Sequence, residues 1–149
     1  MTKIVVAGVN AEGRSCVESV REITETPPFS PWTETSFGGL AEYIGLLPED
    51  AFSPELEPPP GHFRWSYTVK PPLGAQPVGP QYHMHATRTI DFDFCVKGRM
   101  NCILDDETVA LEAGDFIVLK AASHRWENAS ADDEVVMLYM LHTPVDPAI

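Results

Sequence analysis

Two short histidine-bearing stretches constrain this chain more than any other feature. His83-Met84-His85 opens a segment that closes with His124-Arg125-Trp126-Glu127-Asn128. Two histidines at positions i and i+2 of an extended strand place both imidazoles on the same face. A carboxylate follows in the predicted strand 89–96, and the last histidine comes after a second pair of predicted strands. We therefore expect one site that binds a divalent transition metal (Zn, Fe, Mn, Ni or Co), with the ligands His83, His85, Asp91 and His124.

The rest of the chain after residue 82 is dense in short strand patterns separated by turn signals. Strands are predicted over residues 89–96, 100–104, 108–111, 115–119 and 134–142, and another over residues 3–9 near the N-terminus. Asp105-Asp106 is typical of a hairpin turn. Residues 15–23 are compatible with a second strand or with one helical turn. Short strands at even spacing favour a β-sandwich or barrel.

A proline-rich stretch separates these two groups of strands. Residues 26–80 contain twelve of the fourteen prolines, which excludes central strands except in the gaps 40–46 and 63–69. The stretch also carries many aromatic residues, which argues against disorder. We expect an ordered arm that wraps the barrel or a neighbouring subunit.

The two histidine motifs resemble those of the cupin family. His83, His85, Asp91 and Gly98 match the first cupin motif in order, and Gly114, His124 and Asn128 fall in the register of the second. Asp91 stands where glutamate is usual, Pro77 where the first glycine would be, and Lys120 and Ala122 where proline and glycine are usual. The turn Gly13-Arg14-Ser15 ahead of the proline-rich arm resembles that of small single-domain bacterial cupins.

The resemblance implies an all-β fold, a double-stranded jelly roll with an N-terminal strand and a proline-rich arm, and commonly a homodimer. At 149 residues the chain is expected to form a single domain. Residues 1–80 would supply the N-terminal strands and the arm, and residues 81–143 the barrel core.

Composition restricts the partners and the compartment. Acidic residues number 22 against 10 basic ones, for a formal net charge of -12, so a nucleic-acid partner is not expected. The N-terminal apolar run is too short for a signal peptide, and no segment approaches the ~20 apolar residues of a membrane span. Three cysteines without CxxC spacing do not indicate a disulfide framework. We expect a cytoplasmic protein.

Several residues beside the predicted ligands have two interpretations each. Asp91 is a fourth metal ligand, or it orients water or a histidine. Asp93 shares the face of Asp91 and is a general base, or a carboxylate at a subunit interface. Arg88 holds a substrate carboxylate, or pairs with a local acid. Tyr82 and Trp126 stack on an aromatic substrate, or only form walls of the pocket.

The remaining histidines are placed by the strand pattern. His142, at the end of the last predicted strand, could reach the pocket as an acid or base, whereas His62 is expected on the surface.

The leading functional hypothesis is a metal-dependent enzyme that acts on a small organic, aromatic or polyketide-like metabolite. The metal would polarise an oxygen of the substrate while Asp93 or His142 moves a proton, in a lyase, isomerase, decarboxylase or cyclase reaction. An Fe(II)-dependent dioxygenase is the first alternative, and a small-molecule binding protein without catalysis is the second.

Overall fold

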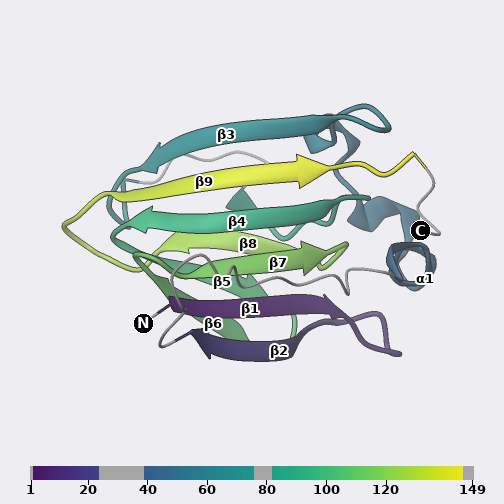
Figure 1. The fold of residues 1–149 in the computed structure, drawn as a ribbon, viewed down its shortest axis with the longest axis horizontal. Helices are drawn as coiled ribbons and strands as arrows, with labels where there is room; N and C mark the ends of the chain where they lie inside the picture. The colour runs from purple at the N-terminus through teal and green to yellow at the C-terminus, as the bar shows by residue number, and fades with distance from the viewer. Residues whose placement is uncertain (1, 24–38, 76–81, 146–149) are drawn as a thin grey trace, which may run out of the picture.

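The computed structural model describes residues 2–23, 39–75 and 82–145, and two β-sheets make up most of this part of the chain (Figure 1). The larger sheet has six strands in the order β2-β1-β7-β4-β9-β3, and the smaller has three in the order β6-β5-β8. The strands of the larger sheet are β1 (Thr2–Val9), β2 (Ser15–Ile23), β3 (Phe63–Lys70), β4 (Ile90–Lys97), β7 (Phe116–Lys120) and β9 (Val135–His142). Those of the smaller sheet are β5 (Arg99–Leu104), β6 (Thr108–Glu112) and β8 (His124–Asn128).

All strand pairs are antiparallel except β1 with β7, which run parallel. The two sheets pack face to face around a core of aliphatic side chains, two cysteines and Trp126. Gly98 turns the chain from β4 in the first sheet to β5 in the second. Its φ is 83°, and an added Cβ would lie 2.8 Å from the carbonyl oxygen of Glu134, so only glycine fits this turn. The all-β jelly roll predicted from the sequence is confirmed.

The predicted strands correspond closely to the observed ones, and residues 15–23 resolve to the strand β2. The gap at 40–46 does not form a strand. It folds as the helix α1 (Leu40–Gly45), because its apolar residues recur at helical spacing, at Leu40, Tyr43, Ile44 and Leu47. Leu40 is fully buried and packs in one cluster with residues of β1, β4 and β7.

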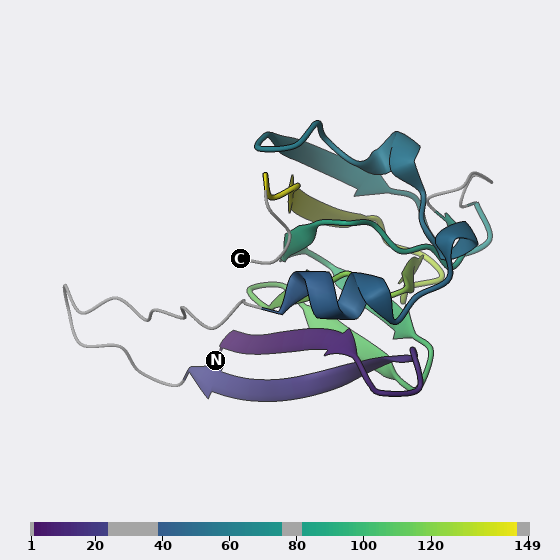
Figure 2. The ribbon, with the colours of Figure 1, turned by 90° about the vertical axis from the view of Figure 1, so that its right-hand side faces the viewer.

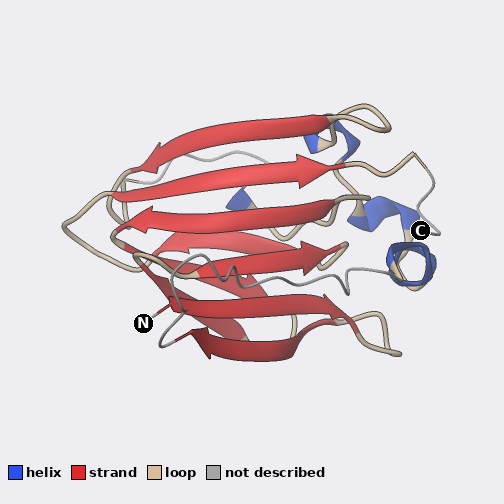
Figure 3. Cartoon of the chain, in the orientation of Figure 1, coloured by secondary structure: helices blue, strands red, loops and turns tan. Residues whose placement is uncertain are grey.

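Two 3₁₀ turns, η1 (Glu49–Ala51) and η2 (Pro54–Leu56), follow α1, and all three gather at one end of the sheets (Figures 2 and 3). Phe52 forms a parallel bridge with Ala86, which ties this part of the arm to the chain just before β4. The stretches 26–38 and 76–80 of the predicted arm lie outside the described residues. None of the described helices is long and apolar enough to cross a membrane.

Candidate functional site

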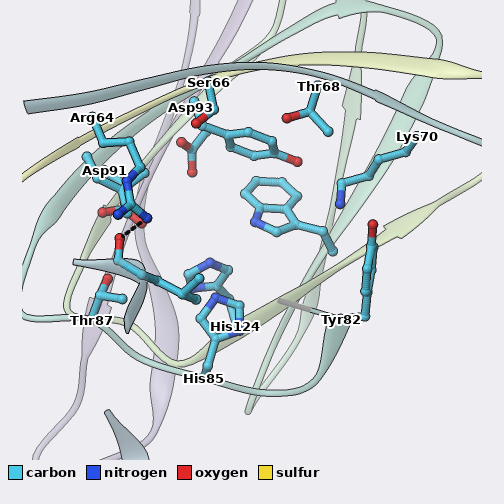
Figure 4. A pocket seen from close by; sticks show the side chains of 14 residues that line it. Arg64, Ser66, Thr68, Lys70, Tyr82, His85, Thr87, Asp91, Asp93 and His124 are labelled. Carbon is cyan, nitrogen blue, oxygen red and sulfur yellow. Dashed lines mark hydrogen bonds between the residues drawn. The ribbon is translucent and has the colours of Figure 1, made fainter. Parts of the chain in front are cut away.

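A cavity of about 230 Å³ lies between the two sheets (Figure 4). A cavity of this size suits a small metabolite. Most of the residues that line it carry a polar group. It is lined by Leu56, Arg64, Ser66, Thr68, Lys70, Tyr82, His85, Thr87, Asp91, Asp93, His124, Trp126, Tyr139 and Leu141.

Two buried histidines, His85 and His124, lie side by side in this wall. Their backbones form a bridge of two hydrogen bonds, of 2.9 and 3.0 Å, and their ring centroids are 4.6 Å apart. The Nδ1–H of His85 donates to the carbonyl oxygen of His83 at 2.7 Å, and that of His124 to Ala122 at 2.8 Å. In a neutral imidazole the proton on Nδ1 leaves Nε2 with a free lone pair. Nε2 of both rings is therefore available to accept a hydrogen bond or to bind a metal ion.

Burial keeps both imidazoles neutral. Burial, together with the neighbouring His85, lowers the pKa of His124 to about 3, against an opposing effect of the Ala122 carbonyl. The pKa of His85 is also lowered by burial, although the carbonyl of His83 partly offsets this. At neutral pH the pair adds no charge to the cavity.

His83 does not share the face of His85. Its side chain is exposed and does not line the cavity, because it lies in a bend and extended pairing begins only at His85. Its carbonyl oxygen, and not its ring, contributes to the site by orienting the His85 imidazole. Histidines at positions i and i+2 share a face only in an extended segment, and the chain is bent at His83.

Asp91 and Asp93 both point into the cavity from β4, as strand alternation predicts. Asp91 accepts a short hydrogen bond from Thr89 Oγ1, which itself lies 2.6 Å from Thr87 Oγ1. Burial raises the pKa of Asp91, and the Thr89 hydrogen bond only partly opposes it. Burial, reinforced by the charge of Asp91, raises the pKa of Asp93 well above its ordinary value. The two carboxyl groups therefore hold at least one proton between them at neutral pH.

Two buried polar atoms at the cavity lack a partner within the described part of the chain. These are Asp93 Oδ1 and the hydroxyl oxygen of Tyr139. Asp93 and Tyr139 are paired across β4 and β9, so both atoms face the same part of the cavity. Burial, followed by the charge of Asp93, raises the pKa of Tyr139 well above 10, so the phenol keeps its proton. An unpaired buried polar atom is costly, and a ligand group or water would satisfy both.

Both predicted aromatic residues line the cavity. Trp126 is buried and makes edge-on contacts with His124, at 5.6 Å between ring centroids, and with Tyr139, at 5.3 Å. Tyr82 lies at the other side of the cavity, with the ammonium group of Lys70 4.4 Å from its ring centroid.

Two predicted catalytic residues lie outside the cavity. Arg88 bonds to the carboxylates of Glu57, at 3.4 Å, and Glu49, and its guanidinium lies over the ring of Phe52. The second predicted interpretation of Arg88, a local ion pair, describes this geometry. His142 stacks on Phe63 with ring centroids 4.2 Å apart. Because Tyr139 and Leu141 of β9 face the cavity, alternation directs His142 to the opposite face.

Sequence reasoning missed the inward face of β3. Its sequence, Phe-Arg-Trp-Ser-Tyr-Thr-Val-Lys, alternates aromatic or apolar with polar residues. The polar set lines the cavity and the apolar set is exposed, which reverses the usual arrangement of an edge strand. The alternation was visible in the sequence, but nothing in it indicated which set faces inward.

The described residues do not fit the predicted metal centre of three histidines and a carboxylate. Within residues 2–23, 39–75 and 82–145, no group of three or more His, Cys, Asp and Glu side chains is placed to hold a metal ion. His85 and His124 offer two nitrogen donors, fewer than the three or four protein ligands usual for zinc. The predicted metal ligation is not assembled in this geometry and remains a prediction.

Three comparisons relate the chain to known proteins. Residues 73–141 match the family model of the cupin domain. Over 80 residues, 53% of this chain, it is 32% identical to "Phomopsin biosynthesis cluster protein D" of Diaporthe leptostromiformis, and the match spans only 42% of that protein. The crystal structure of protein NMB1881 from Neisseria meningitidis shares 18% identity, with 69% of this chain and 95% of that one covered and a TM-score of 0.42. Both histidine motifs lie within the matched region, which supports the resemblance to the cupin family over residues 73–141.

Proposed function

We propose that this protein is an enzyme that moves a proton on a small carbonyl-bearing metabolite bound between the sheets, as an isomerase, lyase, decarboxylase or cyclase does. One observation carries the proposal. A carboxyl oxygen of Asp93 and the hydroxyl of Tyr139 are buried, lack partners among the described residues and face the same cavity. A structural polar pair would be satisfied within the fold, whereas a pair reserved for a substrate stays open.

The two groups suit different parts of such a reaction. Tyr139 keeps its proton and can donate a hydrogen bond to a carbonyl oxygen on which negative charge develops. Asp91 and Asp93 hold at least one proton between them, so one carboxyl group can accept a proton from carbon while the other donates one. Trp126 and Tyr82 would form the walls against which the substrate packs.

The similarity to a protein of a biosynthesis cluster supports a role in the chemistry of a small metabolite, without indicating the reaction. That protein is described by its cluster, and the similarity covers less than half of its length. From this similarity we infer only that the chain acts on or binds a small metabolite. The type of reaction is inferred from the residues that line the cavity.

The test is solvent exchange at carbon. Small ketones, aldehydes and keto acids with acidic C–H bonds are incubated with the full chain in D2O, and loss of the proton signal is followed by ¹H NMR. We expect at least one compound to exchange faster than in buffer, and Asp93→Asn to slow this about 10²-fold or more. Asp115→Asn is the matched control, because Asp115 is equally buried but bonds to backbone amides away from the cavity. Equal rates for wild type and Asp93→Asn, or no exchange above buffer, would refute the proposal.

Metal-dependent chemistry, including the Fe(II)-dependent dioxygenase alternative, is the second candidate. It is favoured by the Nδ1–H donation of His85 and His124 to backbone carbonyls, the arrangement that commonly orients metal-binding imidazoles. No step of the proton-transfer reaction above uses a metal. Elemental analysis of untagged protein tests this candidate. About one equivalent of metal that is lost in His85→Ala but retained in His83→Ala would support it, and less than a tenth of an equivalent would argue against it.

A further inference from the structure

Lys70 is a buried cation without a counter-ion. Its side chain lines the cavity, only 4% of the residue is exposed, and no ion pair holds it within the described residues. Its ammonium group lies over the ring of Tyr82, a contact that favours a positive charge. Buried charged groups are ordinarily paired, so an unpaired lysine in a cavity indicates a missing anionic partner.

The other buried lysine shows the ordinary arrangement. Lys120 is 5% exposed, lies outside the cavity wall, and forms an ion pair with Glu18 at 2.7 Å. Among the described residues, Glu18 therefore pairs with the buried Lys120, which lies outside the cavity, whereas no carboxylate pairs with Lys70.

The remaining charges of the cavity do not neutralise Lys70. Arg64 lies at the other end of the same face of β3 and donates to the carbonyl oxygen of Leu56, not to a carboxylate (Figure 4). Among the described residues, neither Asp91 nor Asp93 forms an ion pair with Lys70. Burial lowers the pKa of Lys70 to about 8, which leaves it protonated at neutral pH. On a chain of net charge -12, this end of the cavity is locally cationic.

Hydroxyl groups accompany the ammonium group. Thr68 lies two residues before Lys70 on the same face of β3, and Tyr82 with its hydroxyl group lies beside Lys70 (Figure 4). Together these groups can donate several hydrogen bonds to one acidic group.

We infer that the ligand of this cavity is a small organic carboxylate, whose acidic group is bound by Lys70 with Thr68 and Tyr82. This rests on the proposed function and deepens it. With its carboxylate at Lys70, the carbonyl end of the ligand extends toward Asp93 and Tyr139, where the proton is moved.

Binding of benzoate and benzamide tests the inference. The two probes have the same shape and differ in charge, and binding to the full chain is followed by quenching of tryptophan fluorescence at pH 7. We expect benzoate to bind at least tenfold more tightly than benzamide to the wild type. Lys70→Met should abolish the difference, Lys70→Arg should retain part of it, and Lys120→Met should leave it unchanged.

Equal binding of the two probes, a benzoate preference that survives in Lys70→Met, or no binding of benzoate at all would overturn the inference. None of these results would affect the exchange assay in D2O. If neutral ketones exchange as fast as keto acids and Asp93→Asn still abolishes exchange, the proposed function stands without the carboxylate. If benzoate binds through Lys70 but no compound exchanges, the protein binds carboxylates without this catalysis.

Discussion

Replacing Lys70 by methionine should stabilise the fold. Burial lowers the pKa of the Lys70 amine from its ordinary 10.5 to about 8, and no ion pair among the described residues opposes this. Each pKa unit corresponds to about 1.4 kcal/mol, so holding the charged amine in the fold costs about 3 kcal/mol. The contact with Tyr82 returns about 1 kcal/mol of this. Methionine has a similar length and no charge, so Lys70→Met should raise the free energy of unfolding by about 2 kcal/mol at pH 7.

The gain should depend on pH in a defined direction. The folded-state pKa of Lys70 lies below its unfolded value, so between pH 8 and 10.5 the unfolded chain binds more protons at this residue. The wild type therefore recovers stability at Lys70 as pH rises through this window, and the difference between the proteins disappears. The groups that face the ammonium group, Tyr82 and the neutral His85, are present in both proteins and cancel in the difference.

Urea unfolding followed by tryptophan fluorescence at pH 7, 8, 9 and 10 measures the difference. Lys120→Met is the control of opposite sign, because it removes the ion pair with Glu18, which then keeps its hydrogen bond from Tyr43, and it should cost about 1 kcal/mol. A Lys70→Met protein that is less stable than the wild type at pH 7, or a gain that is the same at every pH, would refute the reasoning that Lys70 is an unpaired buried charge.

Three other predictions concern the site and the surface. Tyr139→Phe should slow D2O exchange about 10²-fold while leaving benzoate affinity within twofold, because the hydroxyl acts on the developing charge and not on the carboxylate; a loss of affinity without a loss of rate would contradict this. Incubation with a chelator should leave the exchange rate unchanged if the carboxyl groups of Asp91 and Asp93 suffice, and complete loss, restored by one metal, would favour the metal-dependent candidate. The protein should be a homodimer by light scattering, and Trp65→Lys should make it monomeric, since Trp65 is 64% exposed on an apolar sheet face; a monomeric wild type would contradict the assignment of this face.

The sequence predicted the strands well, because their signals are local. Alternation of side chains and turn residues located β4 to β7 and β9, but not β8, and alternation on β4 placed Asp91 and Asp93 on one face, where both line the cavity. The two histidine motifs indicated a resemblance to cupins, and residues 73–141 match the family model of the cupin domain. The helix α1 was not predicted, although its apolar spacing is helical. Residues 40–46 form a gap between prolines, and such a gap could also hold a strand.

The errors in the site have one physical origin: the direction of a side chain depends on where extended structure starts and on which face is inside. His83 was expected beside His85, but extended pairing begins only at His85, and the ring of His83 is exposed. His142 was expected near the pocket, but it lies one residue past the inward-facing Leu141. A shift of one position reverses the face of a strand residue, and a single sequence does not fix that position.

Strand β3 shows most clearly why the site required the structure. As an edge strand paired only with β9, it would ordinarily turn its apolar residues toward the core and its polar residues toward solvent. Here the polar side chains line the cavity, namely Arg64, Ser66, Thr68 and Lys70. The apolar ones are all about half exposed or more, namely Phe63, Trp65, Tyr67 and Val69. Both faces then need a partner from outside the described chain: an anionic ligand on the inner face and an apolar surface on the outer. A second copy that covered the outer face would hold this edge strand in place, and with it Lys70. Monomeric Trp65→Lys protein should therefore bind benzoate more weakly than the dimer, although Trp65 points away from the cavity.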